Sequence, residues 1–482
     1  MRTWLSTHRL FLLLLLVLIA LRLPHINRPL SKHHDFNNAV ILINAVSWSQ
    51  AGGAANVGYT PFMNFQGNSN RVLENGPHID ANGNHVYLSF GAGWYVLPYF
   101  VFHFLQIPPT PLALEILNIF IGLFTVSLLY KLLRQWLANE QQTIQAVALF
   151  ALLPAPLWYM GHSYVTTGIM LPLVLCVLLL WRKAASTSNA LTASFHLQLF
   201  VVIVMLMYFD WVAAFLAAGM GVWGLASMKR NNTYVGLFFT AGISAAVGIG
   251  LIFYQFAQYL SWQQVVDYWS SRSAYRTIAN QDEGWLTMIR HCITHIGSGY
   301  IGLILLLGII TFRQKSIRWL SIPNDWLSWA MIAVLIYNLI LFHWSASHEF
   351  AWMAFALVFT IWLFVHKYEW ISTLSKPVFF LIVAQGLLQY FLINLPGEKG
   401  ITGTAYNDQQ LKAKHITASI PPNAAVFVNM QNPKIIEWYS KRTFNYVPTK
   451  KEAIRIADSL QLKPVFWIDR MEADSMKIQS VR

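Results

Sequence analysis

Long apolar runs recur along most of the chain, and they limit what it can fold into more than any other feature. Several runs approach the ~20 residues that a helix needs to cross a lipid bilayer. Charged residues make up only 11% of the sequence, whereas a soluble domain has about 25%. We therefore predict an all-α polytopic membrane protein with about 11 to 13 transmembrane helices. The apolar runs are 10–24, 88–106, 112–130, 143–161, 164–181, 195–209, 211–226, 233–256, 295–312, 326–344, 350–366 and 378–395.

Basic clusters follow alternate apolar runs. Two runs separate each cluster from the next, so all of the clusters fall on one side of the membrane, which the positive-inside rule makes cytoplasmic. Because these charges lie at helix ends, the formal net charge of +13 predicts contact with the lipid bilayer and not with nucleic acid. We expect a bacterial inner-membrane protein with its functional face toward the periplasm or exterior. The clusters are Lys131/Arg134, Arg182/Lys183, Lys229/Arg230, Arg313/Lys315/Arg318 and Lys367.

Three apolar segments need separate interpretation. The first run has no small-residue cleavage site after it, which predicts an uncleaved transmembrane helix. Segment 88–106 contains two glycines and a proline, and we predict that it is irregular. Segment 195–226 is too long for one span, and each half is short for one. We predict a tight hairpin there that turns at Asp210 on the outer face.

Long polar segments and the C-terminal tail complete the predicted organisation. Residues 1–395 form the transmembrane domain, with large outer loops at 25–87 and 257–294. The tail, 396–482, contains the strand patterns AAVFVN and KPVFWID, with the helical patterns NPKIIEWYSK and TKKEAIRIADSLQ between them. It predicts a small extracytoplasmic α/β domain. The two cysteines, Cys176 and Cys292, lie in or beside apolar runs, so we expect no disulfide.

Asp35 is the leading candidate for chemistry, because the stretch SKHHDFNNA places two histidines and a carboxylate shortly after the first apolar run. The residues that follow alternate between apolar and polar in a helical pattern. They predict an amphipathic helix along the membrane interface, with Asp35 near its start. An aspartate at that point can equally be a helix cap, and the local spacing leaves both interpretations open.

Asp210 and a pair of arginines are further candidates for substrate binding. An ionisable group within an apolar segment is a functional candidate by default, and the alternative for Asp210 is an exposed turn residue. Arg272 and Arg276 share one face if their segment is helical. Arginine matches phosphate with its forked donors, although loop arginines without any role are common.

Three more candidates lie in short turns that we place on the outer face. His348 and Glu349 stand at a helix boundary in the stretch FHWSASHEFAWMAF, and the alternative there is an interfacial loop whose glutamate complements a helix dipole. His343 and His348 are five residues apart, which is poor spacing for two metal ligands on one helical face. His162, in MGHSYVTTG, is the third. We predict no metal ligands and no cofactor, and leave a divalent cation open.

The layout as a whole resembles the GT-C superfamily of integral membrane glycosyltransferases. It is most similar to the family 39 branch, which includes protein O-mannosyltransferases and lipid A aminoarabinose transferases. HHDFNNA stands where that family has a catalytic aspartate in its first outer loop. GNHVYLSFGAGWYVLPYF is similar to the end of that loop and the second helix. HSYVTTGIMLP and HWSASHEFAWM are similar to later outer turns. The usual acidic pair is absent, since Asp35 lies between His34 and Phe36.

The resemblance implies a reaction and its substrates. The donor would be a polyprenyl-phosphate sugar, and the acceptor would be a hydroxyl on a lipid, glycan or protein. Asp35 would act as general base, with inversion at the anomeric carbon. Cationic help for the leaving phosphate would come from Arg272 and Arg276, with His33, His34 and His348 in reserve.

Two other classes of function remain as alternatives. A transporter or flippase predicts polar groups at mid-membrane and inverted repeats, whereas the sequence offers only Asp210 and no repeat. A lipid-linked glycan polymerase or ligase would place its large loop late in the chain, whereas the longest polar loop here follows the first helix.

Overall fold

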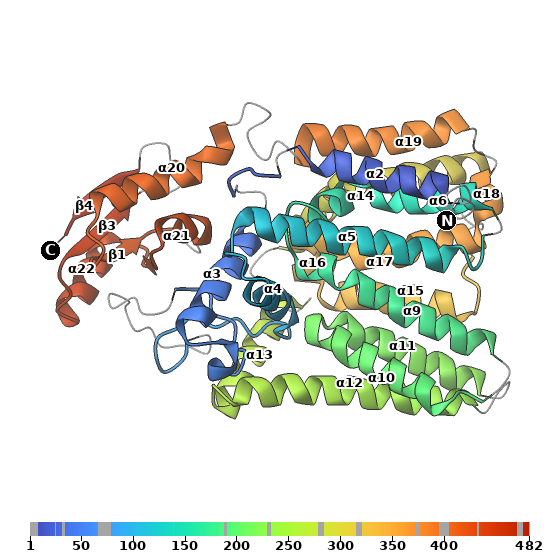
Figure 1. Cartoon of the computed structure of the whole chain (residues 1–482), viewed down its shortest axis with the longest axis horizontal. Coiled ribbons are helices and arrows are strands. Elements are labelled where there is room, and N and C mark those ends of the chain that lie inside the picture. The colour runs from blue at the N-terminus through green and yellow to red at the C-terminus, as the bar shows by residue number, and fades with distance from the viewer. Residues whose placement is uncertain are drawn as a thin grey trace. The chain divides into compact units, whose positions relative to one another are not determined.

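The computed structural model describes residues 8–481 apart from 25, 31–33, 66–78, 138, 188–189, 229–232, 278–283, 315–320, 373, 375, 395–403, 431–432 and 470–475. The chain forms two compact units, and Figure 1 labels their elements. The bundle unit comprises 1–26, 115–253 and 270–395. The mixed unit comprises 27–114, 254–269 and 396–482. Each is described by itself below.

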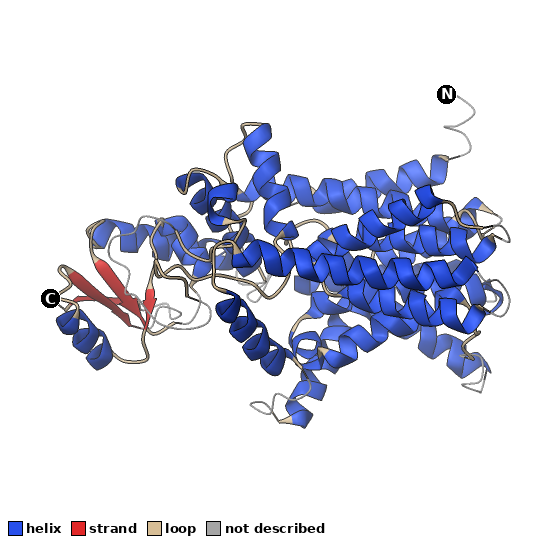
Figure 2. Ribbon diagram, turned by 90° about the horizontal axis from the view of Figure 1, so that it is seen from below, coloured by secondary structure: helices blue, strands red, loops and turns tan. Residues whose placement is uncertain are grey.

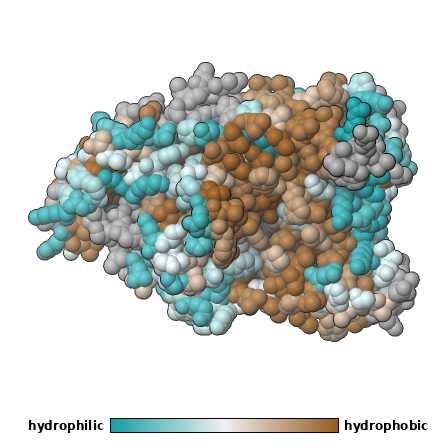
Figure 3. Space-filling model, viewed as in Figure 1, coloured by the Kyte–Doolittle hydropathy of each residue, from teal (hydrophilic) through white to brown (hydrophobic). Residues whose placement is uncertain are grey.

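The bundle unit is made of helices. Apolar side chains cover the helices of this unit in Figure 3, as expected for a surface that faces lipid. The helices are α2 (Arg9–Arg22), α5 (Pro111–Leu133), α6 (Glu140–Ala151), α7 (Pro154–Tyr159), α8 (Thr166–Ile169), α9 (Leu171–Ser186), α10 (Ala193–Phe209), α11 (Val212–Ser227), α12 (Thr233–Ala257), α14 (Trp285–Gln314), α15 (Trp326–Ile340), α16 (Phe342–Ser347), η3 (Glu349–Trp352), α17 (Met353–His366), α18 (Tyr368–Ser372), α19 (Lys376–Gln389) and η4 (Tyr390–Asn394).

Among the described residues, five helical stretches are long and apolar enough to cross a membrane. They are Pro111–Leu133, Thr166–Ser186, Tyr234–Ala257, Trp285–Gln314 and Glu349–His366, and the shorter apolar helices Ala193–Phe209, Val212–Ser227, Trp326–Ile340 and Lys376–Leu392 accompany them. The predicted class, an all-α membrane protein with a small α/β part, is confirmed.

The predicted breaks in the apolar runs are also present. Asp210 has an extended backbone (φ −156°, ψ 148°) that ends α10. Helices α10 and α11 pack against each other, so the predicted hairpin is confirmed. Segment 88–106 yields only α4 (Gly93–Phe104), which contains Pro98. A helix of that length spans about 18 Å, far less than the ~30 Å of a hydrocarbon core.

The mixed unit begins with α3 (Phe36–Gln50), followed by η1 (Ala54–Val57) and α4. Helix α3 packs against α4 and α21 (Lys434–Ser440). The prediction of an amphipathic helix along the membrane interface is wrong, because α3 is buried along most of its length. Its polar residues bond to the following loop: Asn44 Oδ1 accepts from the Phe62 amide at 2.7 Å. Helix α13 (Trp262–Arg276) starts in this unit and ends in the bundle unit.

The C-terminal part of the mixed unit is a small α/β layer structure, coloured by secondary structure in Figure 2. The strands have the order β2-β1-β3-β4, with β1 parallel to β2 and β3, and β4 antiparallel to β3. The predicted strands and helices are confirmed, whereas α20, β2 and β4 were not predicted. The elements are α20 (Thr404–Ser419), β1 (Ala425–Val428), α21, β2 (Asn445–Tyr446), α22 (Lys450–Ser459), β3 (Val465–Asp469) and β4 (Lys477–Ser480).

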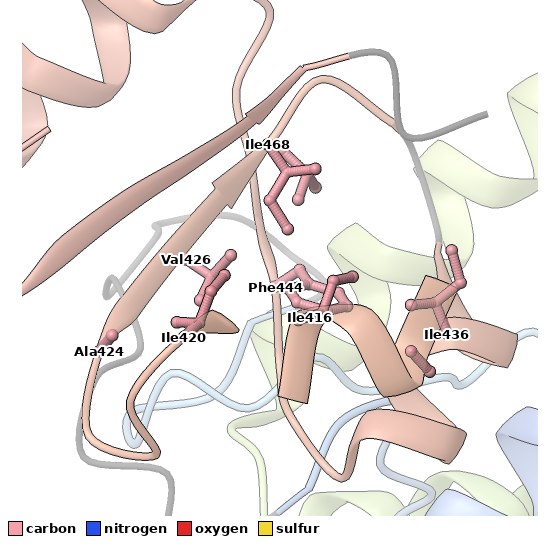
Figure 4. Packing of buried hydrophobic residues seen from close by; sticks show 9 residues of the cluster. Ile416, Ile420, Ala424, Val426, Ile436, Phe444 and Ile468 are labelled. Atoms are coloured by element: carbon pink, nitrogen blue, oxygen red, sulfur yellow. The ribbon is translucent and has the colours of Figure 1, made fainter. Parts of the chain in front are cut away.

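Helices cover both faces of this sheet. Side chains of β1 alternate, since successive residues of a strand point to opposite faces. Val426 and Val428 join Ile416 and Ile420 of α20 and Ile436 of α21, and Figure 4 shows most of this cluster. On the other face, Ala425 and Phe427 pack with Ala453 and Ala457 of α22. A strand buried on both sides explains the uninterrupted apolar pattern of AAVFV.

Candidate functional site

Asp35 immediately precedes α3, and its carboxylate takes part in a buried ion pair. Arg28 Nη1 lies 2.5 Å from Asp35 Oδ2, and Nη2 donates to Oδ1 at 3.0 Å. The Arg28 and Asp35 side chains are 2% and 0% exposed. Asn38 Nδ2 adds a third bond to Oδ1 at 3.1 Å. The carboxylate makes no capping hydrogen bond to α3, so the alternative that Asp35 is a helix cap is wrong.

The backbone before Asp35 is fixed by two unusual features. His34 is half-buried and has a left-handed backbone (φ 57°), which is uncommon for a residue other than glycine. The Leu30 amide donates to the Tyr439 hydroxyl of α21 at 2.6 Å. The C-terminal layer structure therefore helps to hold the segment that carries Arg28 and Asp35. His33, also a candidate, lies outside the described residues.

Asp210 is the centre of a second polar cluster, in the bundle unit. Its side chain is fully buried, so the alternative of an exposed turn residue is wrong. The Tyr337 hydroxyl donates to Asp210 Oδ1 at 2.7 Å, and the Val212 amide donates to the same oxygen at 3.0 Å. Thr166 Oγ1 lies 3.5 Å from Oδ2. The buried guanidinium of Arg276 interacts electrostatically with this carboxylate.

The position of Asp210 between two helices affects its ionisation. Burial raises the pKa of its carboxyl to about 6, while the bonds from Tyr337 and Val212 and the charge of Arg276 act in the opposite direction. The folded protein thus keeps this proton to a higher pH than the unfolded chain does. A raised pKa of a carboxyl lowers the stability of the folded state as the pH rises from about 4 to about 6.

This linkage predicts a difference between the wild type and Asp210→Asn. Over that pH range, we expect the stability of the wild type to fall by about 3 kcal/mol relative to the variant. Thermal unfolding of both proteins in detergent, at a series of pH values, measures the difference. Burial raises the pKa of Asp325, but bonds from His366 and the Ser328 amide lower it further. Asp325→Asn should therefore show the opposite trend, and a flat difference for Asp210→Asn would contradict the prediction.

The predicted arginine pair lies on a helix, so the alternative of loop arginines is wrong. Arg272 is half-buried, and its guanidinium carbon lies 5.6 Å from the centre of the Tyr275 ring. The Tyr275 ring in turn meets that of His343 edge to face at 4.8 Å. Arg276 belongs to the Asp210 cluster. The two arginines therefore have different neighbours, although they are one helical turn apart.

Glu349 and His348 occupy a buried and a half-buried position. Glu349 starts η3 and is 3% exposed. Its Oε1 would lie only 2.9 Å from a Cβ at Gly299, so the glycine leaves the room that this side chain fills. The Tyr300 hydroxyl donates to the Glu349 carbonyl at 2.9 Å. His348 Nδ1 lies 2.9 Å from the Trp344 carbonyl.

His162 joins a buried group of polar residues that the sequence did not predict. His162 Nε2 lies 2.9 Å from the Tyr390 hydroxyl, and Nδ1 lies 4.0 Å from Glu115 Oε2. Arg22, fully buried at the end of α2, packs over Gly161, where a Cβ would meet its Nε at 3.0 Å. An ionisable residue in an apolar run was the available signal for Arg22 and Glu115.

Other functional candidates had no signal in the sequence. Arg28 stands seven residues before Asp35, and Tyr337 is an ordinary aromatic residue of an apolar run. Among the described residues, no three His, Cys, Asp or Glu side chains lie close enough together to hold a metal ion.

The chain matches no protein-family model and no curated protein, but its fold matches solved structures. ArnT from Cupriavidus metallidurans bound to undecaprenyl phosphate is 11% identical with a TM-score of 0.56, over 96% of this chain and 93% of that one. Oligosaccharyltransferase AglB from Archaeoglobus fulgidus, in complex with an inhibitory peptide and a dolichol-phosphate, gives 10% and 0.59, over 96% and 70%. The Archaeoglobus fulgidus oligosaccharyltransferase with zinc and sulfate gives 12% and 0.53, over 95% and 68%. The chain therefore has the fold of the GT-C membrane glycosyltransferases, which its sequence resembles.

Proposed function

We propose that the chain is a membrane glycosyltransferase that moves a sugar from a polyprenyl-phosphate donor to a hydroxyl acceptor. The acceptor is a lipid, a glycan or a protein. The proposal is supported by the fold shared with ArnT and AglB, whose structures contain undecaprenyl phosphate and a dolichol-phosphate. The site faces the extracytoplasmic side of a bacterial inner membrane, and no cofactor is required, with a divalent cation left open.

The observation that carries the proposal is the buried Asp35 carboxylate, held by Arg28 and Asn38 at the start of α3. A buried charge is costly unless it is paired, and buried carboxylates are found disproportionately at functional sites. Asp35 acts as general base: it takes the proton of the acceptor hydroxyl while the oxygen attacks the anomeric carbon, with inversion. A carboxylate paired with arginine is ionised, which is the form that accepts a proton.

The remaining candidates bind the substrates in this proposal. Arg272 and Arg276 stabilise the leaving phosphate, since arginine presents several N–H donors to phosphate oxygens. His33, His34 and His348 are reserves for the same role. The other proposed substrate-binding residues are His162, Asp210 and Glu349.

Sugar transfer from a radiolabelled pool of lipid-linked donors tests this function. Membranes that contain the wild-type chain should label a product that membranes without it do not. If several donors give no product, the transferase proposal is wrong, and uptake and lipid-flipping assays distinguish a transporter or flippase. Growth of a labelled lipid-linked glycan by several units would indicate a polymerase instead.

A further inference from the structure

The Arg28–Asp35 pair raises a mechanistic difficulty for a general base. Both carboxylate oxygens accept hydrogen bonds from the same guanidinium, at 2.5 and 3.0 Å. In an inverting displacement, the nucleophile and the leaving group lie on opposite faces of the sugar. The base beside one and a cation beside the other are therefore separated by the sugar. The contact between Arg28 and Asp35 then describes a state before the donor binds.

The chemistry of Arg28 suggests what opens the pair. Its two terminal nitrogens present parallel donors, an arrangement that fits a phosphate as well as a carboxylate. The guanidinium is buried, so it cannot simply lose its anion: an unpaired buried charge is strongly unfavourable. Another anion must replace the carboxylate when the pair separates.

We propose that Arg28 is an anion site occupied in turn by Asp35 and by the phosphate of a lipid-linked substrate. The phosphate takes the guanidinium, and Asp35 is released with its lone pairs available. The role of Asp35 as base rests on the proposed function, whereas the competition for Arg28 does not.

The reaction sequence balances. The acceptor O–H gives its proton to Asp35, its oxygen forms the new bond to the anomeric carbon, and the bond from that carbon to the phosphate oxygen breaks. The electron pair leaves with the phosphate, whose charge Arg28 meets. When the lipid phosphate departs, Asp35 gives its proton to water and pairs with Arg28 again. In the absence of a donor, the base is occupied and does not activate water.

Direct binding of a polyprenyl phosphate tests the competition without any need for turnover. Binding of undecaprenyl phosphate to the purified full chain in nanodiscs is measured by native mass spectrometry. We expect Asp35→Asn to bind this lipid at least about fivefold more tightly than the wild type, because a competing charge has been removed. We expect Arg28→Gln to bind it at least about tenfold more weakly, since hydrogen bonds to charged groups are lost.

Matched variants and competitors complete the experiment. Asp80 is also a buried carboxylate of the mixed unit, bonded to Tyr259 at 2.7 Å, and Asp80→Asn should leave the affinity unchanged. Arg28→Gln leaves Asp35 buried without its partner, so the double variant Arg28→Gln/Asp35→Asn serves if the single one does not fold. It should bind as weakly as expected for Arg28→Gln. Competition by inorganic phosphate and by phosphatidylglycerol shows whether a free phosphate or an ordinary lipid headgroup takes the site instead.

The outcomes separate this inference from the proposed function. Equal or weaker binding by Asp35→Asn overturns the competition, even if the wild type transfers sugar. Tighter binding by Asp35→Asn together with weak binding by the arginine variant supports it, even if no transfer is found. Unchanged binding by the double variant would remove Arg28 from the site.

Discussion

Asp35→Asn is expected to lower sugar transfer at least about 100-fold, because a positioned general base contributes about 10²–10⁴ to the rate. The asparagine side chain has the same shape and can still accept a hydrogen bond from Arg28 through its oxygen, but it cannot take the acceptor's proton. Initial rates of transfer from the labelled donor, at saturating acceptor, measure the loss. The melting temperature of the variant in detergent shows whether the fold is kept.

Asp80→Asn is the matched control for that experiment. It removes a second buried carboxylate from the mixed unit, one that accepts bonds from Tyr259 and Asn84 at 2.7 Å each. If any loss of buried charge in this unit disturbed activity, both variants would be slow. Transfer by Asp35→Asn within about threefold of the wild type would make the pair with Arg28 purely structural. The base would then be sought at Asp210 or Glu349.

The membrane part of the fold was predictable because its signals are local. The run that became α12 reads as a membrane helix from its residues alone, and Asp210 marks its hairpin by being the charged residue in an apolar segment. Helix α3 misled the prediction for a physical reason. Its polar residues indicated a wet face, but the loop covers that face: besides the Asn44 contact, the Ser47 hydroxyl donates to the Asn64 carbonyl at 2.8 Å.

The candidate site was predictable only in its costly members. A carboxylate in or beside an apolar run needs a partner, which singled out Asp35 and Asp210, but the sequence does not say which partner. Tyr337 is 127 residues from Asp210 and bonds to it only because α11 and α15 pack together. Arg28 is near Asp35 in the chain, but a bidentate contact depends on the turn through His34. Long-range pairs of this kind leave no periodic pattern.

Glu437→Ala is expected to lower the free energy of unfolding of the C-terminal layer structure by about 3–5 kcal/mol, the range for breaking a buried ion pair. Glu437 is 1% exposed; its Oε2 lies 2.7 Å from Lys434 Nζ, and its Oε1 accepts from the Phe444 amide at 3.0 Å. The substitution leaves both an ammonium and an amide buried without their acceptor. Hydrogen exchange of α20–β4 in the full chain measures the change.

Glu452→Ala provides the comparison on the same layer structure. Its carboxylate is 38% exposed and lies 3.9 Å from Arg455, so its removal should cost less than about 1 kcal/mol. The double variant Lys434→Met/Glu437→Leu should recover much of the loss, because apolar side chains often replace a buried pair at little cost. Equal effects of the two single variants would show that the Lys434–Glu437 pair contributes no more than a surface contact.

The same substitution also connects the C-terminal tail to the proposed base. Glu437 lies on α21, the helix that packs on α3 and whose Tyr439 hydroxyl accepts the Leu30 amide at 2.6 Å. Trp438 of this helix stacks on Phe65 of the first loop, with ring centres 6.4 Å apart. Loosening α21 therefore releases contacts on both sides of Asp35 in the chain. We expect Glu437→Ala to lower sugar transfer along with stability, whereas Glu452→Ala should change neither. Full transfer by a Glu437→Ala chain whose tail exchanges freely would mean that α21 does not position Asp35.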